Sequence, residues 1–350
     1  MPYSSLPGQA FWKFCRLSQD FASTLIYTPK FVITNDHAIT TAGSCFAQNI
    51  GHYLRASKAN LLDLEPAPHG LNLQNQYAFG YGLYSARYGN IYSAKQLAQL
   101  VKEVSAKQAR QNIVWEHNGG FYDALRPMIE PNGLSCPDEV LAHRQDHITR
   151  LHKLFRSTDV FIFTLGLTEC WMSKTSKLAF PTCPGVVAGH YNADEYYFHN
   201  ARYHEIQDDL LNAFSGLKCL NPDMKFLLTV SPVPLTATAT GDHVLSATTY
   251  SKSTLRAVAG DLATDHRCID YFPSYELITA GPYQGQFFTP NLRQVTQAGI
   301  DLVMSVFFGA HKGLLKTLPI ENGRVIPQRF TDSMPDNEIC EDLLLDAFSK

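Results

Sequence analysis

A serine between a predicted strand and a predicted helix has the clearest potential for covalent chemistry in this sequence. Ser44 follows Gly43 at the end of an apolar segment, residues 37–42, and apolar side chains recur at helical spacing over residues 45–58. Glycine allows a tight turn that exposes the next side chain, and a helix start offers unpaired N–H groups and a partial positive charge. Such a setting would stabilise the anionic oxygen of a tetrahedral intermediate, although a serine there also commonly caps the helix.

Three further apolar runs, residues 160–165, 225–230 and 268–275, are typical of buried parallel strands. Helical patterns separate them at about residues 201–217 and 249–263, and helices are the usual crossovers between parallel strands. This alternation predicts an α/β fold, a three-layer α/β/α domain with a mostly parallel, open, doubly wound sheet. In such sheets ligands bind beyond the carboxyl ends of the strands.

Polar or acidic residues close each of the four predicted strands. They are Ser44, then Thr168 with Glu169, then Ser231, then Glu276. Because parallel strands end at the same edge of the sheet, we expect these side chains to converge on one site. Glu169 also has a purely structural alternative, in which it ties down a loop or caps a helix.

The predicted sheet lies in one α/β domain, residues 37–308, which we expect to carry loop and hairpin insertions at about 60–130. The insertion begins with a long stretch rich in Gly, Pro, Asn and Tyr, and loops of this length inside a domain are usually functional or poorly ordered. Residues 1–36 are expected to form an irregular arm. Residues 309–350 are expected to form a peripheral tail with a short amphipathic helix at 340–348.

The composition is that of a globular protein and argues against several functional classes. The 350 residues are 45% hydrophobic and 17% charged, with a net charge of -3 and no Lys/Arg-rich run, so nucleic-acid binding is not expected. The N-terminus lacks the basic and apolar regions of a secretory signal, and no stretch reaches the ~18 apolar residues of a membrane span. We therefore expect a cytoplasmic protein without a membrane span.

The cysteines and histidines give no pattern for a metal site. None of the eight cysteines lies in a C-x-x-C pair, and no spacing matches a zinc site. His204-Glu205 begins an H-E-x-x-H motif whose second histidine is missing. We expect free thiols in a reducing compartment, and neither a metal nor a cofactor.

Four motifs occur in order along the chain at the predicted strand ends. The segment 43–47 reads GSCFA, and GLTE, SPVP and PSYE follow at 166–169, 231–234 and 273–276. On these motifs the sequence resembles the GSCFA family over most of its length, and through it the SGNH (GDSL-like) hydrolases. That resemblance implies a three-layer α/β/α sheet that carries a serine esterase, a lipase or a carbohydrate deacetylase.

The resemblance also implies roles for individual residues. Ser44 matches the nucleophile of the first SGNH block, and the segment from Gly166 to Glu169 falls where those enzymes have G-x-N-D. Thr168 would then replace the oxyanion-binding asparagine, with a hydroxyl donor in place of an amide. The residues expected to contact substrate or to supply a further backbone donor are Gly43, Gly80, Gly82, Gly89 and Asn90.

One departure from the SGNH pattern concerns the general base. Those enzymes place a D-x-x-H motif between the last strand and the last helix, whereas the segment 278–299 of this chain contains neither Asp nor His. A serine nucleophile needs a nearby proton acceptor. A base must therefore come from elsewhere, or the protein is not a hydrolase.

The expected base is His243, which follows the Ser231 strand on a loop at the carboxyl side of the sheet. Glu169 or Glu276 would orient its imidazole, since each is expected at a strand end on the same face. The alternative bases, in the loop after Glu169, are His190 and His199.

Together these observations predict a serine hydrolase that cleaves an O-acyl ester, with an O-acylated carbohydrate as the expected substrate class. The first alternative is an O-acyltransferase on the same scaffold, acting in polysaccharide modification. The second is a non-catalytic binding protein, which the missing D-x-x-H motif favours. Cys45 is an alternative nucleophile, and Lys252 with Arg256 forms either a solvated helix face or an anion contact.

Overall fold

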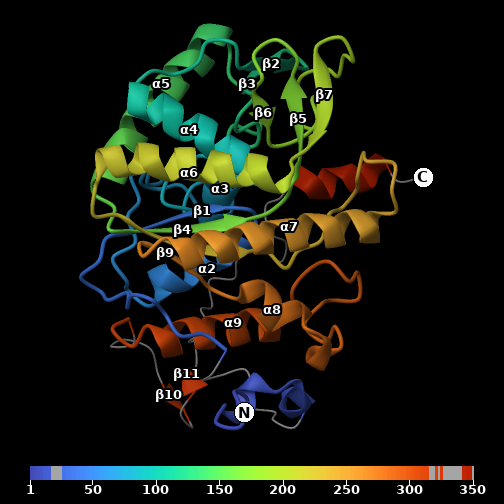
Figure 1. Cartoon of the computed structure of the whole chain (residues 1–350). Coiled ribbons are helices and arrows are strands. Elements are labelled where there is room, and N and C mark those ends of the chain that lie inside the picture. The colour runs from blue at the N-terminus through green and yellow to red at the C-terminus, as the bar shows by residue number, and fades with distance from the viewer. Residues whose placement is uncertain (17–25, 315–319, 322–323, 326–340, 349–350) are drawn as a thin grey trace.

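The computed structural model describes residues 1–16, 26–314, 320–321, 324–325 and 341–348. Its centre is a four-stranded sheet with helices packed on both faces (Figure 1). The strands are β1 (Ile39–Gly43), β4 (Val160–Leu165), β8 (Lys225–Val230) and β9 (Ile269–Tyr271), in the order β1-β4-β8-β9. Each neighbouring pair in this order is parallel, which confirms the predicted α/β fold with a mostly parallel open sheet.

The strand order reverses at β1. After β1 and helix α2 (Phe46–Ala56), the chain returns beside the outer edge of β1, where Ile39 and Leu61 form a parallel bridge. There the Leu62 N–H donates to Ile39 O at 2.9 Å. Strand β4 pairs with the opposite side of β1. The carboxyl ends of β1 and β4 therefore form a topological switch point, which is the usual ligand crevice of an open α/β sheet.

Two helix layers cover the sheet. The first layer consists of α4 (Ala94–Ala106), α5 (Pro137–Arg156), α6 (Tyr203–Leu220) and α7 (Val244–Asp265), and the second of α2, α8 (Ser274–Thr279) and α9 (Gln297–Ala310). Phe161, Phe163 and Leu165 of β4 pack with the first layer, whereas Val160 and Ile162 pack with the second. Figure 1 shows β1 and β4 between α4 and α9. The period of two along β4 is that of a strand buried on both faces.

Two smaller antiparallel sheets lie outside the central one. The hairpin of β2 (Val114–His117) and β3 (Gly120–Asp123) matches the hairpin expected in the insertion, and its turn residues Asn118 and Gly119 both have positive φ. The sequence pattern does not reveal the other sheet. It has the order β6-β5-β7 and consists of β5 (Glu169–Ser173), β6 (Ala179–Phe180) and β7 (Tyr196–Asn200). Glu169 therefore begins a strand rather than following the end of one directly.

A buried ionic cluster fixes the insertion to α5. Arg144 of α5 lies 3.0 Å from Glu103 and 3.2 Å from Asp123. His147, one turn further along α5, places its Nδ1 atom 2.7 Å from the Glu65 carboxylate. Removal of one partner would leave a buried charge unpaired, which typically costs about 3–5 kcal/mol. We assign this cluster a structural role.

Two segments of the domain differ from expectation. The stretch 60–93 contains a short helix, α3 (Leu73–Ala78). The strand expected at 268–275 ends at Tyr271, because Pro273 lacks the N–H that a strand ladder needs. Glu276 consequently lies in α8 and does not end a strand.

The expected arm and tail are described in part. Residues 17–25 of the arm lie outside the described residues, and η1 (Gly8–Ala10) and η2 (Trp12–Arg16) are 3₁₀ turns. Residues 315–319 and 326–340 of the tail also lie outside them. The end of the tail forms a 3₁₀ helix, η5 (Glu341–Phe348), where an amphipathic helix is expected. Further short elements are η3 (Gly281–Tyr283), β10 (Ile320–Glu321) and β11 (Arg324–Val325).

Candidate functional site

Gly43 ends β1 in a conformation that glycine alone adopts readily. Its φ is 137°, and a Cβ atom there would lie 2.4 Å from the Thr164 carbonyl oxygen of β4. This close approach lets the Ser44 N–H donate to the same oxygen at 3.1 Å. Ser44 is therefore held at the carboxyl end of β1, one residue before Cys45, the N-cap of α2.

The Ser44 hydroxyl does not cap the helix. The N-cap of α2 makes no side-chain hydrogen bond, and Ser44 Oγ has no hydrogen-bond partner among the described residues. The residue is nevertheless buried, with 2% of its surface exposed. The structure thus excludes the capping role and leaves a buried hydroxyl that the fold does not use.

Two further hydroxyls at the same edge of the sheet are buried without a partner in the described part of the chain. Thr164 Oγ1 belongs to β4, opposite Gly43, and Thr168 Oγ1 lies in the segment that follows β4. Both residues are at most 1% exposed. Most buried polar groups are paired, because an unpaired one costs about 1–3 kcal/mol. Together with Ser44, these hydroxyls indicate a polar site at the switch point.

The segment 166–168 packs directly against Ser44. A Cβ atom on Gly166 would lie 2.9 Å from Ser44 Cβ. The Gly166 N–H donates to Tyr92 O at 3.0 Å, so the N–H groups of Ser44 and Gly166 are both engaged by backbone carbonyls. The donor that the described structure offers here instead is the Thr168 hydroxyl. The Ala47 and Gln48 N–H groups in the first turn of α2 already donate to Ser44 O and Cys45 O, at 2.8 and 3.0 Å.

One turn of α7 donates and accepts hydrogen bonds with the 166–168 segment. Helix α7 belongs to the first helix layer, on the other face of the sheet from α2. Lys252 Nζ donates to Gly166 O at 2.7 Å, and the Thr168 N–H donates to Ser251 Oγ at 3.1 Å. Lys252 is 1% exposed, and lysine is almost never fully buried unless it is paired. The solvated helix face considered for Lys252 is therefore wrong, and its side chain reaches the backbone that packs on Ser44.

The loop around Asn90 packs behind Ser44. Asn90 Oδ1 accepts hydrogen bonds from Gln48 Nε2, at 3.2 Å, and from the Tyr84 hydroxyl. The Tyr84 hydroxyl also lies 3.2 Å from the Ser44 carbonyl oxygen. Gly89 precedes Asn90 with a φ of 69°, which is a turn conformation. This loop therefore supports the first turn of α2.

The segments that meet at this edge also identify the family. The sequence model of the GSCFA family matches residues 38–307, which is more than half of the chain. The chain belongs to the GSCFA family. The matched region runs from β1 into α9 and includes Ser44, Gly166 and Lys252. A search of the curated proteins finds no match.

The histidine expected as the base is not brought to Ser44 in this GSCFA protein. His243 is exposed and caps α7, where its Nδ1 atom accepts the Leu245 N–H at 3.2 Å. Ser251, which contacts Thr168, lies eight residues further along α7, and eight residues span about 12 Å along a helix axis. The described contacts leave His243 remote from the segment that touches the nucleophile.

Other expected site residues of the GSCFA protein make local contacts. His199 Nε2 lies 3.2 Å from Glu205, and the Glu276 carboxylate pairs with Arg256. Ser231 Oγ accepts a backbone N–H from two residues further along the chain, at 3.3 Å. None of these contacts involves Ser44.

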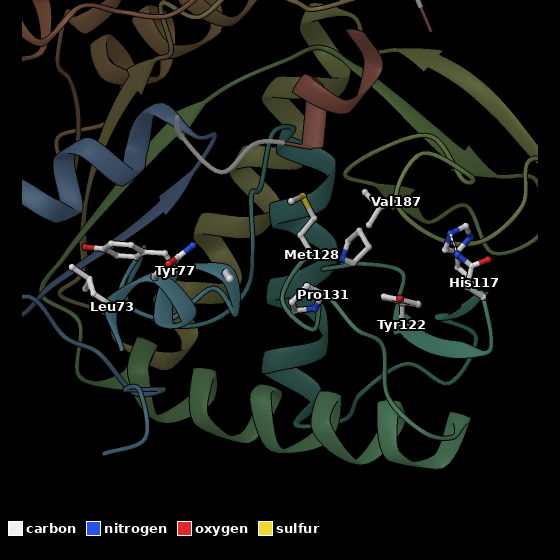
Figure 2. Close-up of a pocket in the computed structure, with 11 residues that line it drawn as sticks. Leu73, Tyr77, His117, Tyr122, Met128, Pro131 and Val187 are labelled. Carbon is white, nitrogen blue, oxygen red and sulfur yellow. Dashed lines mark hydrogen bonds between the residues drawn. The ribbon is translucent and has the colours of Figure 1, made fainter. Parts of the chain in front are cut away.

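One cavity of the GSCFA protein lies near α3, and another lies near the end of β4. The larger, about 950 Å³, lies between α3 and the β2–β3 hairpin, and Figure 2 shows Tyr77 and Val187 among the residues around it. No expected site residue lines it. The second, about 490 Å³, lies beyond the carboxyl end of β4, and its lining includes Leu167, Glu169 and His190. The smaller cavity is therefore the one that adjoins the candidate site.

The described residues of the GSCFA protein bear on metal binding, on disulfides and on membrane insertion. They contain no group of three or more His, Cys, Asp or Glu side chains that could hold a metal ion. No disulfide joins the described cysteines, and Cys45, the alternative nucleophile, is 3% exposed. None of the described helices is both long and apolar enough to cross a membrane.

Proposed function

We propose that this GSCFA protein hydrolyses an O-acyl ester, with Ser44 as the nucleophile. The observation that carries the proposal is the Ser44 hydroxyl, which has no partner in the described part of the chain and is buried before a helix start at the switch point of a parallel sheet. A structural serine in this position would bind the N–H groups of the first helical turn. The fold itself gives this hydroxyl no hydrogen bond among the described residues, whereas nucleophilic attack on a substrate would give it a function.

In the proposed reaction, Ser44 Oγ attacks the ester carbonyl carbon and loses its proton to a base. The carbonyl oxygen becomes an oxyanion, which the Thr168 hydroxyl would stabilise, together with the partial positive charge at the start of α2. Collapse of the tetrahedral intermediate breaks the bond to the alcohol oxygen, which receives the proton from the base. Water then repeats these steps on the acyl-serine and releases the acid. This is the chemistry of the SGNH hydrolases that the motifs resemble.

The proposed base is Lys252, in place of His243. Lys252 contacts Gly166, which packs on Ser44, whereas His243 caps the start of the same helix, nine residues or about 14 Å away along its axis. A neutral lysine amine can accept a serine proton, as in Ser-Lys catalytic pairs, and burial favours the neutral form. Because Ser44 Oγ has no hydrogen-bond partner among the described residues, the Lys252 amine has to move from Gly166 O to Ser44 Oγ when substrate binds; catalytic hydrogen bonds often form fully only in that complex.

A non-catalytic binding protein is the second candidate, and the burial of Ser44 favours it. At 2% exposure, the Ser44 hydroxyl is reached only if the side chains that cover it move. The N–H groups of Ser44 and Gly166 are also engaged by the fold. In this alternative the hydroxyls of Ser44, Thr164 and Thr168 bind a polar ligand without breaking a bond in it.

Hydrolysis of aryl esters by the full chain and its Ser44→Ala variant tests the choice. Hydrolysis at Ser44 predicts that the variant loses at least about 10³-fold in kcat/KM and keeps its melting temperature. Ser305→Ala is the matched control, because Ser305 bonds locally to Leu302 O within α9. Absence of wild-type turnover, or equal turnover by the wild type and Ser44→Ala, would favour the binding protein.

A further inference from the structure

The cavity beyond β4 has walls that are mostly apolar and aromatic. Its volume of about 490 Å³ is typical of small-molecule sites. Trp171 meets Tyr191 and Phe198 edge to face, at 5.2 and 5.7 Å between ring centroids. Other wall residues are Leu167, Phe180, Leu235 and Phe348. Such walls leave most hydroxyl groups of a sugar ring without hydrogen bonds, which makes a sugar a poor occupant.

A few polar groups accompany the apolar walls. Glu169 is 9% exposed, and its Oε1 atom accepts the Thr238 hydroxyl at 2.8 Å. Thr182 is 5% exposed, and its Oγ1 atom has no partner among the described residues. A small number of placed polar groups within an apolar lining is the usual pattern of sites that orient one polar end of a ligand.

The cavity adjoins the proposed nucleophile through one short segment. Leu167 and Glu169 line the cavity, and Thr168 between them carries a buried, unpartnered hydroxyl in the described structure. The preceding residue, Gly166, packs on Ser44. An ester whose carbonyl carbon lies at Ser44 can therefore extend one substituent past Thr168 into the cavity.

We propose that the cavity beyond β4 binds an aliphatic acyl chain of medium length. This inference rests on the proposed ester hydrolysis at Ser44, and it names the acyl side of the substrate. An acetyl group would leave most of a cavity of about 490 Å³ unfilled. Each methylene that enters an apolar site strengthens binding by about two- to fourfold, so a longer chain gains affinity until the cavity is full.

The first experiment measures kcat/KM of the full chain for aryl acetate, butyrate, hexanoate, octanoate, decanoate and dodecanoate. We expect a rise of about two- to fourfold per methylene, and at least about 50-fold between acetate and octanoate. A flat or falling series would overturn the inference. So would a preference for aromatic acyl groups over every aliphatic chain.

Two neighbouring valines provide matched variants. Val186 lines the cavity beyond β4, whereas Val187 lines the larger cavity between α3 and the hairpin (Figure 2). Val186→Trp should fill the first cavity and abolish the dependence of kcat/KM on chain length. Val187→Trp should leave the whole series unchanged. A dependence on chain length that survives Val186→Trp would contradict the assignment.

Binding to the Ser44→Ala variant separates this inference from the proposed function. Calorimetry with aryl octanoate and aryl acetate then measures affinity without attack by Ser44. Tighter binding of octanoate, lost when Val186→Trp is added, would support the cavity even if the wild-type protein hydrolyses nothing. Equal affinity for the two esters would overturn the cavity assignment and leave hydrolysis at Ser44 untouched.

Discussion

Gly166 packs so closely on Ser44 that a Cβ atom at position 166 would lie 2.9 Å from Ser44 Cβ. The same atom would lie 3.2 Å from the Tyr92 ring. Gly166 also accepts the hydrogen bond from Lys252 Nζ and donates one to Tyr92 O. This one residue therefore joins the end of β4, the buried lysine of α7 and the proposed nucleophile.

Replacement of Gly166 by alanine should disturb both stability and activity. The added methyl group has to push Ser44 or Tyr92 aside, and overpacking of this kind costs about 1–3 kcal/mol of unfolding free energy. A small displacement of the nucleophile lowers kcat/KM by about 10- to 100-fold. Urea unfolding and ester hydrolysis measure the two effects.

The control for Gly166→Ala is Gly309→Ala. Gly309 lies in α9, and a Cβ atom there meets nothing within 4 Å. Alanine is the better helix former, so this variant should gain up to about 1 kcal/mol. Wild-type activity in Gly166→Ala would show that the contact with Ser44 is unimportant.

Replacement of Gly43 by alanine should cost more than replacement of Gly166. At a φ of 137° a side chain is strained, and the new Cβ atom would meet the Thr164 backbone rather than a side chain that can turn away. We expect a loss of about 3 kcal/mol or more in unfolding free energy, measured by urea titration. Equal losses of unfolding free energy in Gly43→Ala and Gly166→Ala would mean that β1 can move away from β4.

Removal of the Lys252 amine tests the proposed base. Lys252→Met keeps most of the apolar stem and should lower kcat/KM by about 10²- to 10⁴-fold, the usual contribution of a general base. The control is Lys102→Met, since Lys102 lies exposed on α4. A wild-type kcat/KM in Lys252→Met would assign Lys252 a structural role alone.

A buried histidine after α9 predicts sensitivity to acid. His311 Nδ1 accepts the Ile33 N–H at 3.2 Å, and burial lowers the pKa of His311 to about 4. Because this value lies below the unfolded pKa of about 6.5, the unfolded chain binds the proton first as the pH falls. The stability that His311 contributes is complete above about pH 6.5 and is lost towards pH 4, by up to about 3 kcal/mol.

Urea unfolding as a function of pH measures this effect. His311→Gln should flatten the dependence of unfolding free energy on pH between about 6.5 and 4, whereas His69→Ala, at an exposed position, should not. His147, whose pKa burial also lowers to about 4, will retain part of the slope. A wild-type slope in His311→Gln would contradict the prediction.

The strands of the central sheet could be predicted because Val160–Leu165 and Lys225–Val230 are nearly continuous apolar runs, as parallel strands buried on both faces require. The pairing of β5 with β7 could not be predicted from the sequence. Tyr196–Asn200 is half-buried along its whole length, and it pairs with Glu169–Ser173 across a long intervening loop. Contacts between distant segments, rather than a local pattern, fix that pairing.

In the candidate site, too, local sequence features predict one residue, whereas a contact between distant segments places another. Ser44 could be predicted because the preceding glycine and the following helix are local features of the sequence. Lys252 was considered only as part of a solvated helix face or as an anion contact, and its burial beside Ser44 was not predicted, because its partner, Gly166, is 86 residues away. One signal could have found it, since Lys252 shares a helical face with Leu255 and Ala259, which are both buried. A lysine on the apolar face of a helix indicates a buried amine.

The most direct test of the central claim is covalent labelling of the full chain with a fluorophosphonate, followed by peptide mass spectrometry. A nucleophilic Ser44 predicts one phosphonyl adduct on the peptide that contains Ser44. The adduct should be absent from Ser44→Ala and should form more slowly in Lys252→Met. No adduct at saturating probe, or an adduct on Cys45 instead, would contradict the account.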